Sequence, residues 1–222
     1  MTTTDDLFTS IWGGDAARVG ALLAETPTLA NTANAGGMSP LLAATYARQP
    51  AMVDLLLAAG AAPDIFVAAA QGRLDWLRDL LARNPGLVAA YSADGWTALH
   101  LAGHFGADDA ARLLLESGAN ANARSHNEMD NLPLHAACAG SPTHAVVALL
   151  LDAGADVNAR QHGGFTPLHE VAQNGVLDLA HLLLERGADT SIRTDDGKTA
   201  RELALEQGHA EMVALLEAHG GS

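Results

Sequence analysis

A histidine beside a glutamate is the pair of residues in this sequence that most resembles a catalytic site. The pair is His169 and Glu170, in the stretch FTPLHEVAQNG at residues 165–175, where a helix is expected to begin. Such a pair can act as a general base with its orienting partner, or as the first half of a pair of zinc ligands on a helix. Its role depends on the elements that carry it.

Other catalytic motifs are weak or missing in the sequence. The stretch GGDAARVGALL at residues 13–23 lacks the spacing and the Lys-Ser/Thr of a phosphate-binding loop, and no serine lies in a G-x-S-x-G elbow. Cys138 is the one cysteine, so neither a disulfide nor a C-x-x-C motif exists, and we expect a small buried hydrophobe. We therefore predict no catalytic residue, metal or cofactor.

The composition predicts an all-α protein with a core of small aliphatic side chains. Hydrophobic residues make up 49% of the 222 residues but aromatic residues only 4%, which favours close-packed helices over a sheet sandwich. A net charge of −14 argues against nucleic-acid binding and against an anionic membrane. The sequence has no apolar run of 18 residues and its amino end is acidic, so we expect a cytoplasmic protein.

One pattern recurs along the chain. TALHLAGHFG at 97, LPLHAACAG at 132 and TPLHEVAQNG at 166 are close copies, while SPLLAATYA at 39 and TARELALEQG at 199 are weaker copies. Each copy is followed by a leucine run that ends at a glycine, and the last three of these, Gly154, Gly187 and Gly220, are 33 residues apart. Self-similarity at a fixed period indicates a repeat architecture.

The period, the T-P-L-H motif, the leucine run and the G-A-D-x-N-A signature together resemble the ankyrin repeat over nearly the whole chain. The resemblance implies an all-α solenoid of about seven helix-turn-helix units with projecting β-hairpin fingers, in which stacking completes the core. Thr97 and Thr166 can cap helices, and Pro167 suits a first helical turn. The compact form resembles a stand-alone, bacterial-type ankyrin repeat domain.

Two departures from the repeat are expected to alter the stack. Gly60 to Gly72 spans 12 residues where Gly187 to Gly208 spans 21, so one finger should be missing. Residues 6–15 also match residues 64–73 at an offset of 58, which indicates a duplicated block of two repeats. The finger at 125–135 carries two extra residues, and a second insertion at GSPT lengthens the next turn.

We divide the chain into one domain, residues 1–222, of seven units. The units are an N-terminal cap at 1–35, inner repeats at 36–62, 63–93, 94–124, 125–160 and 161–193, and a C-terminal cap at 194–222. Arg201 and Glu202 stand in the last unit where inner repeats carry Leu and His, which suits a polar cap.

The repeat gives the histidine a structural interpretation. His100, His135 and His169 occupy one position in successive units. In the ankyrin pattern this residue is similar to a structural histidine that hydrogen-bonds between adjacent repeats. We therefore predict that His169 and Glu170 are not an active site and that the protein is not an enzyme.

The resemblance places partner binding on the concave surface formed by the finger tips and the first helices. Five of the nine aromatic residues fall at its variable positions, which favours a binding stripe over scattered packing. The predicted partner-binding residues are Trp12, Met38, Tyr46, Asp94, Trp96, His104, Phe105, Met129, Asp130, Asn131, His162, Phe165, Gln173 and Asn174.

These observations predict a monomeric protein–protein interaction module with no nucleic-acid or membrane partner. The acids Asp94, Asp130, Asp195 and Asp196 would steer a protein partner with a basic surface. Two alternatives stay open. One is a small-molecule-binding or catalytic solenoid that uses the aromatic groove and a finger cluster, defined as His126, Glu128, Asp130 and His162. The other is a self-associating scaffold.

Overall fold

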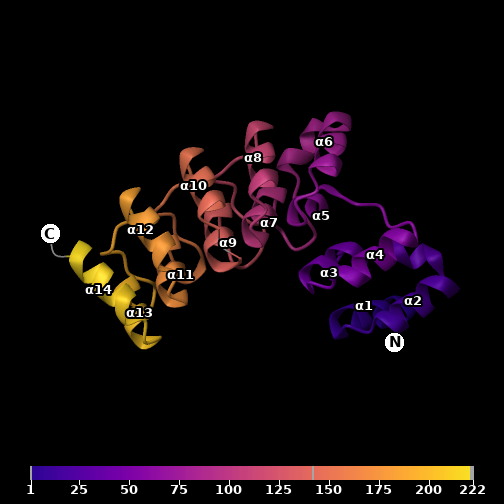
Figure 1. The fold of residues 1–222 in the computed structure, drawn as a ribbon, viewed down its shortest axis with the longest axis horizontal. Helices are drawn as coiled ribbons and strands as arrows, with labels where there is room; N and C mark the ends of the chain where they lie inside the picture. The colour runs from indigo at the N-terminus through magenta and orange to yellow at the C-terminus, as the bar shows by residue number, and fades with distance from the viewer. Residues whose placement is uncertain (1, 142, 221–222) are drawn as a thin grey trace.

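The protein is an all-α stack of helix pairs, as the computed structural model describes it for residues 2–141 and 143–220 (Figure 1). Within these ranges fourteen α-helices form seven helix-turn-helix units, as predicted. The helices are α1 (Thr3–Gly13), α2 (Ala16–Glu25), α3 (Pro40–Tyr46), α4 (Pro50–Ala58), α5 (Ile65–Ala70), α6 (Leu74–Arg83), α7 (Ala98–Phe105), α8 (Asp108–Glu116), α9 (Pro133–Ala139), α10 (His144–Asp152), α11 (Pro167–Asn174), α12 (Leu177–Glu185), α13 (Ala200–Glu206) and α14 (Ala210–His219). Short 3-10 helices lie at η1 (Pro27–Asn31), η2 (Pro85–Ala89) and η3 (His162–Gly164).

Local sequence explains where the helices begin and end. The Thr97 hydroxyl accepts a hydrogen bond from the backbone of His100, which caps α7 as predicted. At α11, Thr166 makes no such cap, and its hydroxyl lies 2.8 Å from His169 Nδ1 instead. Pro167 occupies the first turn of α11, where its missing N–H costs nothing. Gly175 ends that helix in the left-handed conformation (φ 71°).

The core lies between the two rows of helices. The first helices of successive units pack on one another, and small residues such as Ala69 and Ala102 let them approach closely. The leucine runs of the second helices supply the larger side chains, and Leu150 and Leu183 are fully buried. Burial of Cys138 likewise confirms that it is a core hydrophobe, and burial raises the pKa of its thiol.

The fingers are hydrogen-bonded turns rather than β-hairpins. In the described ranges the strand pairing amounts to one isolated bridge, between Tyr91 and Thr97, so the expectation of β-hairpins is wrong in this detail. Neighbouring fingers are joined by backbone hydrogen bonds. These run from His126 N to Gly95 O (2.8 Å), from His162 N to Met129 O (2.9 Å) and from Asp195 N to Gly163 O (2.9 Å). Four successive fingers therefore form one connected edge.

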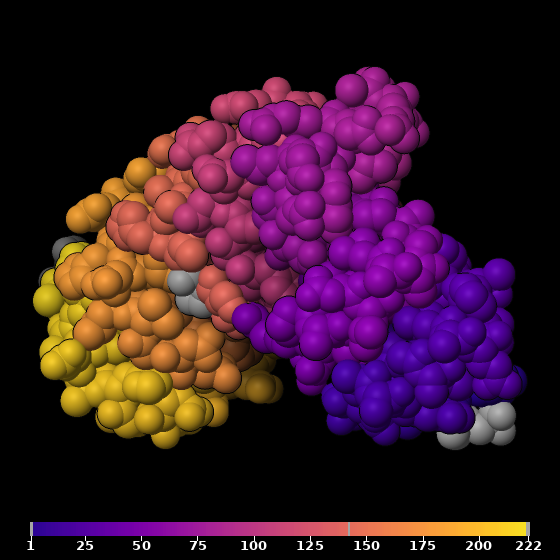
Figure 2. Space-filling view, turned by 45° about the vertical axis from the view of Figure 1, so that its right-hand side comes forward, coloured from indigo at the N-terminus to yellow at the C-terminus, as the bar shows by residue number. Residues whose placement is uncertain are grey.

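The missing finger between α4 and α5 changes the stack. In the described residues the second helices of successive units pack side by side except at α4 and α6. Figure 1 shows α1 to α4 running in a different direction from α5 to α8, and the buried side chains divide into two clusters that meet at α5 and α7. In the space-filling view the two ends of the stack lie on either side of a hollow (Figure 2). The short connection thus bends the solenoid.

The remaining departures also have structural counterparts. η1 and η2 begin at residues 27 and 85, which is the offset of 58 found in the sequence. In the GSPT insertion Pro142 lies outside the described residues, and Gly140 (φ −88°) does not take the left-handed conformation. None of the helices in residues 2–141 and 143–220 combines the length and apolarity that crossing a membrane requires.

Candidate functional site

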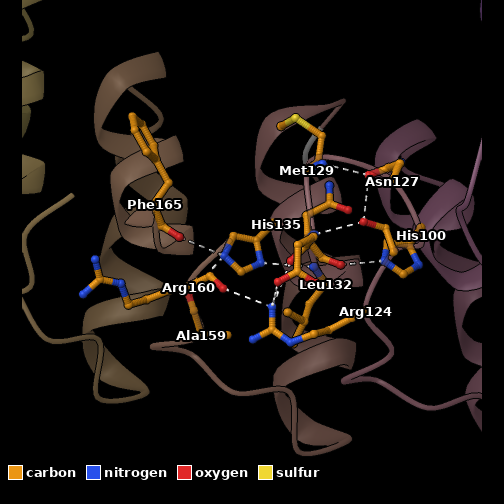
Figure 3. Close-up of polar contacts among 12 residues, drawn as sticks. His100, Arg124, Asn127, Met129, Leu132, His135, Ala159, Arg160 and Phe165 are labelled. Atoms are coloured by element: carbon orange, nitrogen blue, oxygen red, sulfur yellow. Dashed lines mark hydrogen bonds and ion pairs between the residues drawn. The ribbon is translucent and has the colours of Figure 1, made fainter. Parts of the chain in front are cut away.

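The repeated histidines join neighbouring units. His135 Nε2 lies 3.0 Å from Ala159 O and 3.2 Å from Phe165 O, and its Nδ1 accepts a hydrogen bond from Leu132 N (Figure 3). His100 reaches Asn131 O (3.1 Å) and His169 reaches Lys198 O (3.2 Å) in the same way. These partners require a neutral ring with the proton on Nε2. The predicted structural role of the histidines is confirmed.

Burial keeps these rings neutral. It lowers the pKa of His100 and of His135 to about 4 and also lowers the pKa of His169, because a charged imidazole would lose its hydration. Next to His169, the Glu170 carboxylate accepts a hydrogen bond from Gln161 Nε2 (2.6 Å), and burial raises the pKa of Glu170. Each member of the pair thus faces its own structural partner.

The finger cluster does not converge. The His126 ring stacks on Tyr91 with 3.6 Å between ring centroids, and Asp130 pairs with Arg124 Nη1 at 2.7 Å. Within residues 2–141 and 143–220 no three His, Cys, Asp or Glu side chains lie close enough to hold a metal ion. His126, Glu128, Asp130 and His162 are each exposed, and His126 and Asp130 make these contacts with residues outside the cluster.

An aromatic cluster lies where the end of α3 meets α7, and we define it as Tyr46, Trp96, His104 and Phe105. The ring of Phe105 lies 5.8 Å from Tyr46 and 5.1 Å from His104, and His104 lies 5.2 Å from Trp96. All four residues are half-buried. The expected exposure therefore fails for these side chains, because they cover one another.

Apart from Asn131, the other predicted partner-binding residues fall into three groups by exposure. Trp12 (51% exposed) and Met129 (47% exposed) present apolar surface to solvent. Phe165, Met38 and Asp94 are half-buried, and the exposed polar members are Asp130, His162, Gln173 and Asn174. Met129 and Phe165 project to the same side of the histidine network in Figure 3. The backbone bond from His162 N to Met129 O ties their two fingers together.

Asn131 is not a surface residue. Its side chain is 4% exposed, its N–H donates to Ser125 Oγ, and its carbonyl accepts from Ser125 N and His100 Nε2. Trp96 and Phe165 occupy the equivalent position in other units and are only half-buried. The shorter asparagine side chain does not reach past the finger, so its predicted exposure is wrong.

Three of the four predicted steering acids are already engaged. Asp130 pairs with Arg124 (2.7 Å), Asp195 pairs with Arg160 (3.0 Å), and Asp94 accepts a hydrogen bond from Tyr46. Asp196 is exposed. The ion pairs of Asp130 and Asp195 weaken the field of these two acids, which reduces the attraction expected for a basic partner.

A cleft between α4 and α6 was not foreseen from the sequence. It has a volume of about 420 Å³, and Arg48 and Arg73 lie at its wall with Phe105. One signal was present, because Arg48 stands where most units carry a glycine after the first helix. We refer to this feature as the α4–α6 cleft.

Comparison with known proteins finds a matching repeat family and relatives that are similar over part of the chain. The family model "Ankyrin repeats (3 copies)" matches residues 65–161 and 144–221. The chain is 36% identical over 92 residues to "Neurogenic locus Notch protein" of Drosophila melanogaster, covering 41% of this chain and 3% of that protein. It is 35% identical over 92 residues to "Neurogenic locus notch homolog protein 2" of Homo sapiens, covering 41% of this chain and 4% of that protein. The similarity thus spans a small part of these relatives.

Proposed function

The chain belongs to the ankyrin repeat family, and on that premise we propose that it binds a partner protein on its concave face. Domains of this family generally mediate protein–protein interactions and are usually not catalytic. The stacked units offer an extended surface of the kind that solenoids use for binding.

The observation that carries the proposal is the exposed Met129 on a braced finger. An apolar side chain that stays 47% exposed gains free energy when a partner covers it. Two hydrogen bonds hold its finger: His162 N donates to Met129 O, and Asn127 Nδ2 donates to Asp94 O (2.8 Å). Because the finger is already held in place, it loses little conformational freedom when a partner binds. We define the finger patch as Met129, Asp130, His162, Phe165, Gln173 and Asn174, and assign it the main contact.

The aromatic cluster has a supporting role in this proposal. Its rings pack against one another, so they are held in place before a partner binds. Half-buried aromatic side chains surrounded by polar groups resemble the centres of binding interfaces. Trp96 is therefore expected to contribute to binding through its exposed edge.

The experiment is a binding titration with matched variants. A protein retained by the wild type from an extract of the source cell is identified, purified and titrated by calorimetry. Met129→Ala with Phe165→Ala should weaken binding by at least about 2 kcal/mol, as for a central contact. Leu205→Ala is the control, because Leu205 is 59% exposed on α13 and lies outside the patch. Unchanged affinity of the double variant would refute the assignment.

Further parts of the proposal can be tested separately. A basic partner requires an association rate that falls with added salt. We also propose a monomer, and light scattering after size exclusion distinguishes it from a self-associating scaffold. The cytoplasmic location and the stand-alone, bacterial-type character stay predictions.

A further inference from the structure

The α4–α6 cleft lies at the bend of the solenoid. Its walls come from α3, α4, α5, the turn before α6 and the end of α7, and the lining includes Arg48, Val53, Leu57, Gln71, Arg73 and Phe105. Its volume of about 420 Å³ falls in the range of small-molecule sites in proteins. The cleft exists because α4 and α6 do not pack side by side in the described structure.

Arg48, which lines the cleft, has an unfavourable backbone conformation. Its φ is +52°, in the left-handed region that non-glycine residues rarely adopt. In five other units the residue that follows the first helix in this conformation is a glycine, namely Gly14, Gly72, Gly106, Gly175 and Gly208. An arginine at this position costs conformational free energy that a glycine would not, so its side chain needs a compensating role.

The Arg48 guanidinium has no acidic partner. Among the described residues, nine of the twelve Lys and Arg side chains form ion pairs, and Arg48, Arg78 and Arg112 are the exceptions. Arg48 Nη2 donates to Ser141 Oγ (2.6 Å), which lies outside the cleft lining, and the guanidinium carbon lies 5.3 Å from the centre of the Phe105 ring, which belongs to the lining. These contacts orient the group, and a guanidinium with five N–H donors keeps others for an anion.

The other charges of the cleft limit what can bind. Arg73 also lines it, but its guanidinium pairs with Asp75 (3.1 Å) and stacks on Trp76 at 3.9 Å. Asp54 adds a carboxylate to the wall. Arg48 is therefore the one cation of the lining without an ion pair, and Asp54 offsets its charge within the lining. This balance leaves a place for a single anionic group beside Arg48 and disfavours a polyphosphate.

The remaining wall is apolar and amide-rich. Val53, Leu57 and Phe105 supply hydrocarbon surface, and Gln71 donates through Nε2 to Thr45 Oγ1 (2.8 Å). We propose that the α4–α6 cleft binds a small monocarboxylate with an apolar body. The carboxylate pairs with Arg48, and the apolar body lies on Val53, Leu57 and Phe105. This site is separate from the finger patch, and it shares only Phe105 with the aromatic cluster.

The test uses phenylacetate as the probe, with phenylacetamide as its uncharged counterpart. Titration of the full chain is followed by two-dimensional NMR, and the expected result is shifts of the cleft residues with phenylacetate but not with phenylacetamide. Arg48→Gly introduces the residue of the other units, so it should fold with an equal or higher melting temperature. It should weaken phenylacetate binding at least about tenfold.

Two further variants separate charge from position. Arg112→Ala removes an unpaired, exposed cation on α8 outside the cleft and should leave the affinity unchanged. Arg48→Lys keeps the charge without the planar fork and should bind with intermediate affinity. Equal binding by wild type and Arg48→Gly, or equal binding of the amide, would overturn the proposal. Much tighter binding of a dipeptide with a free carboxyl end would also overturn the proposal, because the ligand would then be the C-terminus of a peptide and not a small acid.

Discussion

The Tyr46 hydroxyl donates a hydrogen bond of 2.5 Å to Asp94 Oδ2, and this bond joins α3 to the loop before α7. The two residues belong to units that are not adjacent in the chain. They meet because the intervening unit has no finger, so α3 leans across to α7, where Tyr46 also packs on Phe105. The bend of the solenoid therefore rests on a small number of polar and aromatic contacts.

Substitution of Tyr46 by phenylalanine tests this contact. The variant keeps the ring and removes the hydrogen bond to a charged acceptor, so it should lower the free energy of unfolding by about 1.5–3 kcal/mol in urea titrations. Tyr91→Phe is the matched control, because the Tyr91 hydroxyl makes no hydrogen bond within the described residues. Equal losses in the two variants would show that the bond between Tyr46 and Asp94 contributes nothing.

The buried histidines predict a dependence of stability on pH. The pKa of His100 and of His135 is about 4 in the folded protein, whereas the ordinary pKa of histidine, which applies to the unfolded chain, is 6.5. Between pH 6.5 and pH 4 the unfolded chain therefore binds protons that the folded chain does not. Stability should fall as the pH drops through this window, by up to about 1.4 kcal/mol per pH unit for each histidine. Below pH 4 their contribution should stop changing.

The measurement compares unfolding free energies between pH 6.5 and pH 5, above the range of most carboxylates. The variant His100→Gln with His135→Gln should be less stable at pH 7, because it loses hydrogen bonds between units. Its stability should also depend less steeply on pH. Parallel curves for the wild type and the variant would contradict the neutral, buried state of these rings.

The repeat motifs predicted the local part of this structure well. Three kinds of feature act through neighbours in sequence: a cap such as Thr97, a first-turn proline such as Pro167, and the leucine runs. Their effects could therefore be predicted directly from the sequence. The contact of Tyr46 with Asp94 could not be predicted, because it depends on how two distant units tilt once a finger is missing. The burial of Asn131 depends likewise on side-chain length beneath a folded finger.

The candidate site shows the same division. The sequence pattern predicts variable positions on the concave face, and two of the predicted residues, Met129 and Trp12, are exposed. It did not identify the α4–α6 cleft, which results from the absence of packing between two helices. The arginine at a glycine position was visible in the repeat alignment, but the space around it was not.

A ranking of core and finger substitutions tests the register of the stack. Leu150 is fully buried in α10, so Leu150→Ala should cost about 2–5 kcal/mol of stability through lost burial and the cavity it leaves. His126→Ala should cost less than about 1 kcal/mol, because this exposed side chain makes a single stack on Tyr91. Urea melts of both variants give the ranking, and the reverse order would place the helices in a different register.

The connected edge of fingers can be tested at one glycine. Gly95 has a φ of +83°, and a Cβ there would lie 2.7 Å from the carbonyl carbon of His126 and 2.8 Å from its oxygen. Gly95→Ala must therefore push apart the two fingers that the bond from His126 N to Gly95 O joins.

Gly118 has a similar φ of +92° with no atom within 4 Å, so Gly118→Ala reports the backbone cost alone, about 1–2 kcal/mol. Gly95→Ala should cost about 1–3 kcal/mol more, the usual penalty for overpacking. Thermal and urea unfolding of the two variants measure the difference, and equal destabilisation would mean that the fingers separate without loss and do not act as one edge.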